Sequence, residues 1–202
     1  MRKITAAVFV SLDGVMQAPG GPDEDTDSGF TAGGWVFHYF DEATGGVMDE
    51  LFERKFDLLL GRKTYDIFAG YWPKQGADDP IGKLFNSVTK YVATHGHQKL
   101  DWENSQSLGS DVVATLRELK ASDGPELLIQ GSADLIQTLI EHDLIDEYRL
   151  LIFPVLLGKG KRLFGDGTVT QALNLMEQRT FPNGVMLASY VPAGELKTGS
   201  FV

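Results

Sequence analysis

The chain has 202 residues, of which 43% are hydrophobic and 23% charged, with a formal net charge of −10 and no cysteine. This composition excludes a mainly disordered chain, and the lack of cysteine excludes disulfides and thiolate metal sites. The acidic balance argues against a nucleic-acid-binding surface. The sequence has neither a signal-peptide pattern nor an apolar run of about 18 residues, so we expect no membrane association and a cytoplasmic location.

The first half of the chain alternates strand and helix patterns around one long loop. We expect a buried strand at Ile4–Ser11, an irregular glycine-rich loop at 12–35, a helix at 41–56, a buried strand at 57–60 and, after Gly61, a short helix to Phe68. Pro80 is placed to be the first residue of another short helix, with Asp79 as its cap.

The second half continues this alternation and ends differently. We expect strands at 90–94, 126–130 and 147–154, with helices at 110–121, capped by Ser110, and at 132–142. Buried strands joined by helices predict a parallel sheet with helices on both faces. The segments 172–180 and 185–191 flank the turn signal Asn183-Gly184, which predicts an antiparallel hairpin. We therefore predict an α/β fold with a mixed, mainly parallel sheet in one domain over residues 1–195, followed by a tail at 196–202.

The sequence LLLGRKTYD at 58–66 places a strand, a glycine and a helix start in direct succession. Gly61 would let the backbone approach a phosphate closely, and the free N–H groups of the following helix would attract it. Arg62 and Lys63 add positive charge, and Thr64 adds a hydroxyl donor. The alternative is an ordinary glycine turn before a helix, with Arg62 and Lys63 as solvated surface charges. A diphosphate site needs the free N–H groups, the positive charge and the hydroxyl donor together, and this segment supplies all three.

Two further strand ends carry polar groups. In IQGSADL at 129–135, Gly131 turns the chain and Ser132 begins a helix, which indicates either a second anion site or a simple capped helix. In YVATHGH at 91–97, two histidines follow Thr94 and either meet a 2′-phosphate or have no role. No acidic or histidine partner lies near them in the sequence, so we expect no metal site.

An acidic residue follows the first strand. Asp13, in SLDGVMQ at 11–17, is followed by Gly14, and this pair is typical of a turn. The functional interpretation places the acid at the mouth of the sheet, beside a long loop that could close over a substrate.

These motifs, taken in order, resemble the dihydrofolate reductase-like superfamily, and most closely the branch of the C-terminal reductase domain of the riboflavin-biosynthesis protein RibD. The matching segments are VSLDG at 10–14, FDLLLGRKTYDIF at 56–68, YVAT at 91–94, ELLIQGSADLIQTLI at 126–140 and LIDEYRLLIFPVLLGKGKRLF at 144–164. Their order and spacing agree over roughly residues 1–190.

The resemblance implies a three-layer α/β/α fold, NADPH as the reductant, a small-molecule substrate and a homodimer. It implies that the cofactor phosphates are held by Gly61, Arg62, Lys63 and Thr64, and that the site is completed by Gly131, Ser132, Ala133, Asp134 and Leu135. Thr94 and His95 would lie near the adenosine end of the cofactor, and Asp13 near the nicotinamide.

The sequence departs from the family pattern at two places. The usual Gly-Gly pair of the later corner is Gly131-Ser132 here. Dihydrofolate reductases place an acid in the helix before GRKT, and that register falls near Gly45, with Asp49 and Glu53 one or two turns further on. Asp13, Asp49 and Glu53 all remain candidates for relaying a proton.

We therefore expect an NADPH-dependent reductase of a small pterin- or pyrimidine-like heterocycle, similar to 5-amino-6-(5-phosphoribosylamino)uracil reductase or dihydrofolate reductase. The substrate would enter under the loop at 15–35, where Trp35, Phe37 and Tyr39 either stack on it or pack in the core. The alternative is a non-catalytic nucleotide- or flavin-binding module on the same fold, which turnover or a yellow colour would distinguish.

Overall fold

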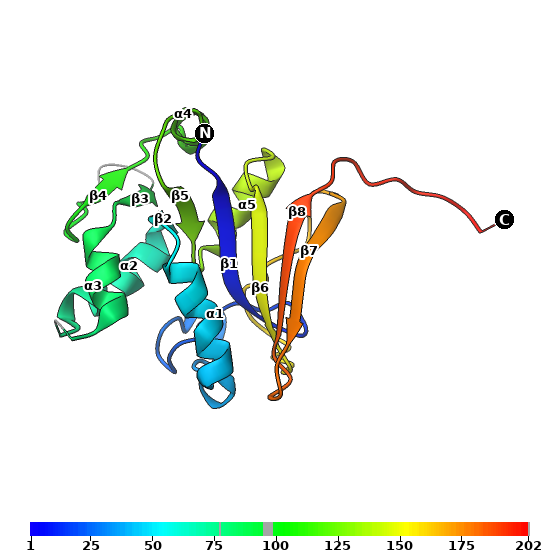
Figure 1. Cartoon of the computed structure of the whole chain (residues 1–202), viewed down its shortest axis with the longest axis horizontal. Helices are drawn as coiled ribbons and strands as arrows, with labels where there is room; N and C mark the ends of the chain where they lie inside the picture. Colours follow the sequence, from blue (N-terminus) through cyan, green and yellow to red (C-terminus); the bar gives the residue numbers. More distant parts are fainter. Residues whose placement is uncertain (77, 95–98, 202) are drawn as a thin grey trace.

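A mixed eight-stranded sheet forms the centre of the fold in the part of the chain that the computed structural model describes, residues 1–76, 78–94 and 99–201. The strands are β1 (Ile4–Ser11), β2 (Phe56–Gly61), β3 (Lys90–Ala93), β4 (Ser105–Ser107), β5 (Glu126–Ile129), β6 (Glu147–Phe153), β7 (Leu173–Thr180) and β8 (Met186–Pro192). Their order across the sheet is β4-β3-β2-β5-β1-β6-β8-β7 (Figure 1). The strands from β4 to β6 in this order are parallel, and β8 and β7 form an antiparallel hairpin beside β6.

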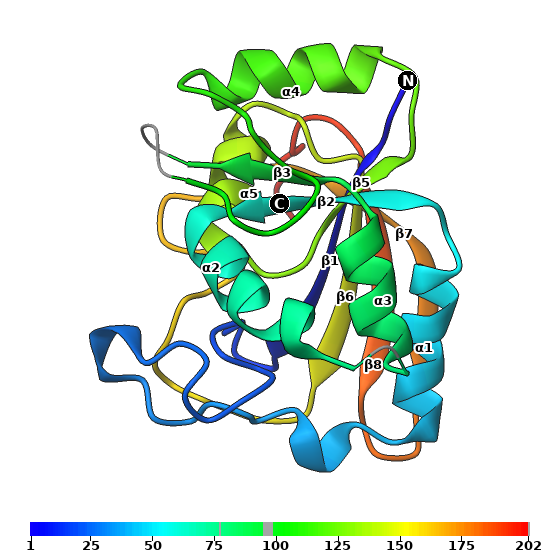
Figure 2. The ribbon, with the colours of Figure 1, turned by 90° about the vertical axis from the view of Figure 1, so that its left-hand side faces the viewer.

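Helices cover both faces of the sheet. They are α1 (Glu42–Phe52), α2 (Arg62–Tyr71), α3 (Pro80–Ser87), α4 (Val112–Ala121) and α5 (Ala133–Glu141), with short 3-10 helices η1 (Asp27–Gly29), η2 (Phe37–Tyr39) and η3 (Trp72–Lys74). Leu116 of α4 and Ile136 of α5 belong to the core on one face, while Val47, Tyr65 and Phe85 bring α1, α2 and α3 to the other. Figure 2 shows α4 on the opposite side of the sheet from α1 and α3. None of the described helices has the length and apolarity needed to span a bilayer.

The predicted α/β class is confirmed, with its mainly parallel sheet, helices on both faces and C-terminal antiparallel hairpin. Asp79 caps α3 as predicted, because its carboxylate accepts a hydrogen bond from the main-chain N–H of Gly82. The hairpin turn contains Gly184 at a φ of +84°. This is a backbone conformation that glycine adopts at little cost.

Three details differ from the predictions. The helix predicted at 41–56 ends at Phe52, and Phe56 instead begins β2, where its ring packs 5.9 Å from that of Phe52. The helical spacing of these two phenylalanines therefore reflects one shared core, not one helix. Asp111, and not Ser110, caps α4 by accepting a hydrogen bond from Ala114. The short strand β4 was not predicted, since its sequence Ser-Gln-Ser has no apolar pattern.

The strand order creates an opening near the middle of the sheet. β2 and β5 are neighbours, but α2 follows β2 on one face and α5 follows β5 on the other. Such a switch point leaves a crevice beyond the carboxyl ends of the strands. β5 pairs with β1 only from Ile4 to Ala6, whereas β1 continues beside β6 as far as Ser11. Residues 7–9 of β1 therefore border the crevice.

A buried ion pair at the amino ends of the parallel strands ties the N-terminus to the core. The guanidinium of Arg2 pairs with the carboxylate of Asp57, and the two side chains are only 3% and 12% exposed. Arg2 also donates from Nε to the carbonyl oxygen of Pro125 at 2.6 Å. Because both charges are removed from water, each depends on the other for its stability.

Replacing Arg2 with alanine should lower the free energy of unfolding by about 3–5 kcal/mol, because it leaves the Asp57 carboxylate buried without its cation. The matched control is Lys99→Ala, which removes the cation of the Lys99–Asp101 pair, whose side chains are 86% and 71% exposed. That loss should cost at most about 1 kcal/mol. Urea unfolding followed by circular dichroism measures both variants, and equally small losses would contradict the role given to Arg2.

Candidate functional site

A cavity of about 1700 Å³ opens at the carboxyl ends of the parallel strands. Its lining comes from residues 7–9 of β1, the loop at 16–27, the helices α1, α2 and α3, the end of β3 with Thr94, the starts of α4 and α5, and Lys161. Ligands of open α/β sheets bind at this edge, so the cavity is the candidate site.

The N-terminal ends of α2 and α5 meet on one side of the cavity. The main-chain N–H of Gly61 donates a hydrogen bond to Oγ of Ser132 at 2.8 Å. Gly131 has a φ of +79°, and a Cβ atom on it would lie 3.2 Å from Cγ2 of Thr64. A side chain at Gly131 would therefore be strained and would push the two helix ends apart.

These two helix ends lack the caps that close the other helices. Gly61 and Ser132 occupy the N-cap positions of α2 and α5 without a side-chain hydrogen bond to the helix. The caps of α1, α3 and α4 are aspartates whose carboxylates accept a main-chain N–H of the first turn: Asp41, Asp79 and Asp111. The first-turn N–H groups of α2 and α5 therefore offer donors and a positive dipole end to an anion.

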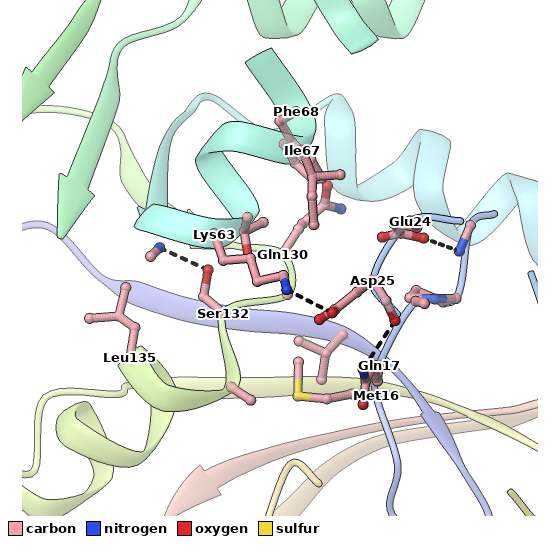
Figure 3. Close-up of a pocket in the computed structure, with 18 of the residues that line it drawn as sticks. Met16, Gln17, Glu24, Asp25, Lys63, Ile67, Phe68, Gln130, Ser132 and Leu135 are labelled. Atoms are coloured by element: carbon pink, nitrogen blue, oxygen red, sulfur yellow. Dashed lines mark hydrogen bonds and ion pairs between the residues drawn. The ribbon is translucent and has the colours of Figure 1, made fainter. Parts of the chain in front are cut away.

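The basic side chains at the start of α2 already bind carboxylates. Arg62 pairs with Asp66 one turn along the helix, at 2.8 Å between Nη2 and Oδ1. Lys63 extends from α2 to the loop, where its Nζ lies 2.8 Å from Oδ1 of Asp25 and also pairs with Asp27 (Figure 3). Burial opposes the charge of Lys63, but its hydrogen bonds to the two aspartates outweigh burial and raise its pKa.

A second lysine binds the same two carboxylates. Nζ of Lys161 lies 2.6 Å from Oδ2 of Asp25 and 2.9 Å from Oδ2 of Asp27. Hydrogen bonds from Lys63 and Lys161 lower the pKa of Asp27 to about 2. The buried amide of Gln17 completes this anchor, because it donates to the carbonyl oxygens of Asp25 and Asp27 at 3.0 and 3.2 Å and accepts from the N–H of Lys161 at 3.0 Å. The loop is thus held over the cavity.

Asp13 is absent from the lining of the cavity. Its Oδ1 accepts hydrogen bonds from Oγ of Ser11 at 2.6 Å and from the N–H of Leu157 at 3.1 Å, and its Oδ2 accepts from the N–H of Gly158 at 2.7 Å. The bond from Ser11, followed by those from the two main-chain groups, lowers the pKa of Asp13 to about 2 against the opposing effect of burial. In this structure Asp13 fastens the loop after β6 to the end of β1.

The two other candidate acids differ in their placement. Asp49 is an exposed residue of α1 that lines the cavity, and its carboxylate has no hydrogen-bond or ion-pair partner among the described residues. Glu53 is the C-cap residue of α1 and does not line the cavity.

The remaining residues predicted to bind the cofactor lie along the same side of the cavity. Thr94 is buried and lines the cavity after β3. The residues at the two helix starts that line it are Gly61, Arg62, Lys63, Thr64, Gly131, Ser132, Ala133, Asp134 and Leu135. His95 lies outside the described residues.

Another wall of the cavity, here called the apolar wall, is lined by apolar and aromatic side chains and was not predicted from the sequence. It is formed by side chains of α1, α2, η3 and α3, among them Met48, Phe52, Ile67, Phe68, Trp72 and Phe85. The ring of Phe85 is central, with centroids 5.0 Å from Trp72 and 5.9 Å from Phe68. Figure 3 shows Ile67 and Phe68 across the cavity from Met16 and Gln17. The apolar residues of this wall recur along their helices at the same spacing as the core residues. The sequence pattern alone therefore does not distinguish cavity-lining residues from core residues.

The aromatic residues considered for substrate stacking lie elsewhere. Trp35 and Tyr39 pack edge-on against Phe153, with ring centroids 5.4 and 6.3 Å apart. Phe37 is 74% exposed. None of the three lines the cavity, whereas Phe40 does. For Trp35 and Tyr39, core packing is therefore the correct alternative.

Known proteins resemble this chain in both sequence and fold. YyaP of Bacillus subtilis (strain 168) is 30% identical over 196 residues, which are 94% of each chain. A pyrimidine reductase-like protein from Corynebacterium diphtheriae superposes with a TM-score of 0.61 at 13% identity, covering 96% of this chain and 93% of its own. A Thermotoga maritima diaminohydroxyphosphoribosylaminopyrimidine deaminase/5-amino-6-(5-phosphoribosylamino)uracil reductase gives a TM-score of 0.62 at 16% identity, covering 95% of this chain and 57% of its own.

These structural matches support the dihydrofolate reductase-like fold implied by the sequence motifs. The family model described as the RibD C-terminal domain matches residues 2–187, nearly the whole chain. The chain therefore belongs to the RibD C-terminal domain family.

Proposed function

We propose that this protein is an NADPH-dependent reductase that transfers hydride to a small pterin- or pyrimidine-like heterocycle related to the riboflavin pathway. One observation carries the proposal: the uncapped N-termini of α2 and α5 meet at Gly61 and Ser132 beside the open edge of β1. Two converging helix ends suit a diphosphate, and the open strand edge suits a flat ring.

The residues around this junction fit a nicotinamide dinucleotide. The N–H groups that follow Gly61 and Gly131, together with the hydroxyl of Thr64, would hold its diphosphate. The main chain of residues 7–9 of β1, beyond the end of β5, offers donors and acceptors to a carboxamide. Thr94, with His95, would lie toward the adenosine end. The bound cofactor supplies the hydride, and these residues orient it against the substrate.

Replacing both Arg62 and Lys63 with alanine should weaken NADPH binding by about 1–3 kcal/mol, because charged hydrogen bonds to the phosphates are lost. Lys159→Ala is the matched control, since Lys159 is exposed and outside the cavity lining. Isothermal titration with NADPH measures all three proteins. An unchanged affinity in the double variant would refute the assignment of the phosphate site.

We propose Asp49 as the group that holds a proton for the substrate. It is the one candidate acid among the described residues that lines the cavity, and it belongs to α1, one of the helices of the apolar wall. A carboxylate at this place could bind a ring N–H or carry a proton to a ring nitrogen as hydride arrives. Asp13, with its hydrogen bonds to Ser11, Leu157 and Gly158, serves as a structural fastener in this proposal.

Asp49→Asn should reduce turnover by about 10²-fold or more while leaving NADPH affinity unchanged, since only the proton-transfer group is removed. The assay is NADPH oxidation at 340 nm with a panel of pterins and aminopyrimidines. The matched control on the same helix is Glu42→Gln. If Glu53→Gln loses turnover and Asp49→Asn does not, Glu53 and not Asp49 is the group that holds the proton. NADPH binding without oxidation by any substrate would favour the non-catalytic nucleotide-binding module.

The proposal includes the homodimer implied by the family resemblance. β7 is an edge strand of the sheet, and its side chains Leu175 and Met176 are 52% and 66% exposed. Exposed apolar residues on an unpaired strand edge favour association with another copy.

A further inference from the structure

The apolar wall of the cavity carries almost no charge. From α1, and from Ile67 through η3 and α3, the described lining residues are glycine, apolar or aromatic side chains with the single exception of Asp49. Two of the helices of this wall have capped N-termini, because the carboxylates of Asp41 and Asp79 accept hydrogen bonds from first-turn N–H groups of α1 and α3, whereas the uncapped N-terminus of α2 belongs to the helix-end junction. The apolar wall therefore offers no cation to a phosphate, and its one uncapped helix end, that of α2, is the end proposed to bind the cofactor.

The cavity contains three basic side chains among its described lining residues, and each already has a carboxylate partner. Arg62 is held by Asp66 on its own helix. Lys63 and Lys161 share Asp25 and Asp27, with Nζ–Oδ distances of 2.8 Å for Lys63 to Asp25 and 2.6 Å for Lys161 to Asp25. A phosphate at either lysine would have to displace these aspartates or lie beside them.

The excess of acidic side chains over basic ones in the described lining also disfavours a phosphate on the substrate. The described lining contains eight carboxylates, namely Asp23, Glu24, Asp25, Asp27, Asp49, Asp66, Asp111 and Asp134, against three basic side chains. Like charges in a partly desolvated cavity repel strongly. The open ends of α2 and α5 can offset this repulsion for a diphosphate, and the proposed cofactor occupies both of them.

We propose that the substrate of this reductase is a flat, unphosphorylated heterocycle that is neutral or cationic, and that Asp25 and Asp27 exclude phosphorylated substrates by neutralising Lys161, the basic side chain of the lining that the cofactor phosphates do not require. This inference rests on the proposed function. The ring lies against the apolar wall around Phe85, and Asp49 is the polar group that binds its ring nitrogens. The chain differs in this respect from the Thermotoga maritima protein, whose name specifies a phosphoribosyl substrate.

The test compares ligands that differ only in a phosphate. NADPH binding is measured first. Protein saturated with NADP⁺, which prevents turnover, is then titrated with 6-hydroxymethylpterin and its monophosphate, and with uridine and uridine 5′-monophosphate. At least one unphosphorylated member should bind tenfold or more tightly than its phosphorylated partner.

The double variant Asp25→Asn/Asp27→Asn tests the mechanism of exclusion. It releases Lys161 while Lys63 remains with the cofactor phosphates, so affinity for the phosphorylated members should rise about tenfold while affinity for the unphosphorylated members stays within about twofold. Asp23→Asn is the matched control, because it removes a carboxylate of the same loop without releasing a lysine; it should change neither affinity by more than about twofold.

The outcomes separate this inference from the proposed function. A protein that binds NADPH but prefers the phosphorylated members, or binds none of the four ligands, overturns the inference and leaves the reductase proposal standing. A double variant that gains nothing for phosphate overturns the role of Asp25 and Asp27. A protein that does not bind NADPH overturns the proposed function itself.

Discussion

The close approach of two helix ends at Gly61 and Gly131 is the constraint on which the candidate site depends. β2 and β5 are neighbours in the sheet, yet the helices that follow them leave toward opposite faces. The N–H of Gly61 binds Oγ of Ser132, and Gly131 lies where a Cβ atom would crowd Thr64. The departure from the usual Gly-Gly pair is thereby explained, since the side chain of Ser132 becomes the link between the corners.

The caps of the helices divide the cavity into two chemically different halves. Aspartates close the N-termini of α1, α3 and α4, whereas α2 and α5 begin without a capping side chain. A cap stabilises a helix by about 1 kcal/mol, so leaving two ends open costs stability unless another group uses the free donors. The open ends face the cavity together. Anions are therefore favoured at these two helix ends, and flat apolar molecules at the apolar wall.

The sequence was sufficient for features that depend on local pattern. Buried strands, the glycine corners at Gly61 and Gly131, the cap at Asp79 and the Asn183-Gly184 hairpin all follow from residue types at fixed spacing. It was insufficient where tertiary contacts decide. Phe56 has helical spacing but begins a strand. The pairing of Lys63 and Lys161 with loop aspartates joins residues more than 30 positions apart, and local pattern does not report such pairs.

Local sequence pattern was also insufficient to choose among the three candidate acids of the site, Asp13, Asp49 and Glu53. Asp13 follows a strand that ends at the cavity edge, so its position in the sequence is as suggestive as that of Asp49. Its carboxylate accepts hydrogen bonds from the nearby Ser11 and from the main chain at 157–158, and only the latter contacts, which come from the return of the chain after β6, join residues far apart in the sequence. The local sign of the loop anchor in the sequence is Gln17, a polar residue among apolar neighbours in GVMQAP.

The loop anchor also links the two halves of the cavity. Lys63 belongs to the start of α2, where phosphates are expected, but in this structure its charge holds Asp25 and Asp27. Lys161 binds the same carboxylates independently, and the amide of Gln17 fixes their main chain. The loop therefore keeps an anchor when Lys63 turns to another anion. A phosphate at the helix ends competes with the loop for one lysine only, so cofactor binding and an ordered loop over the substrate wall are compatible.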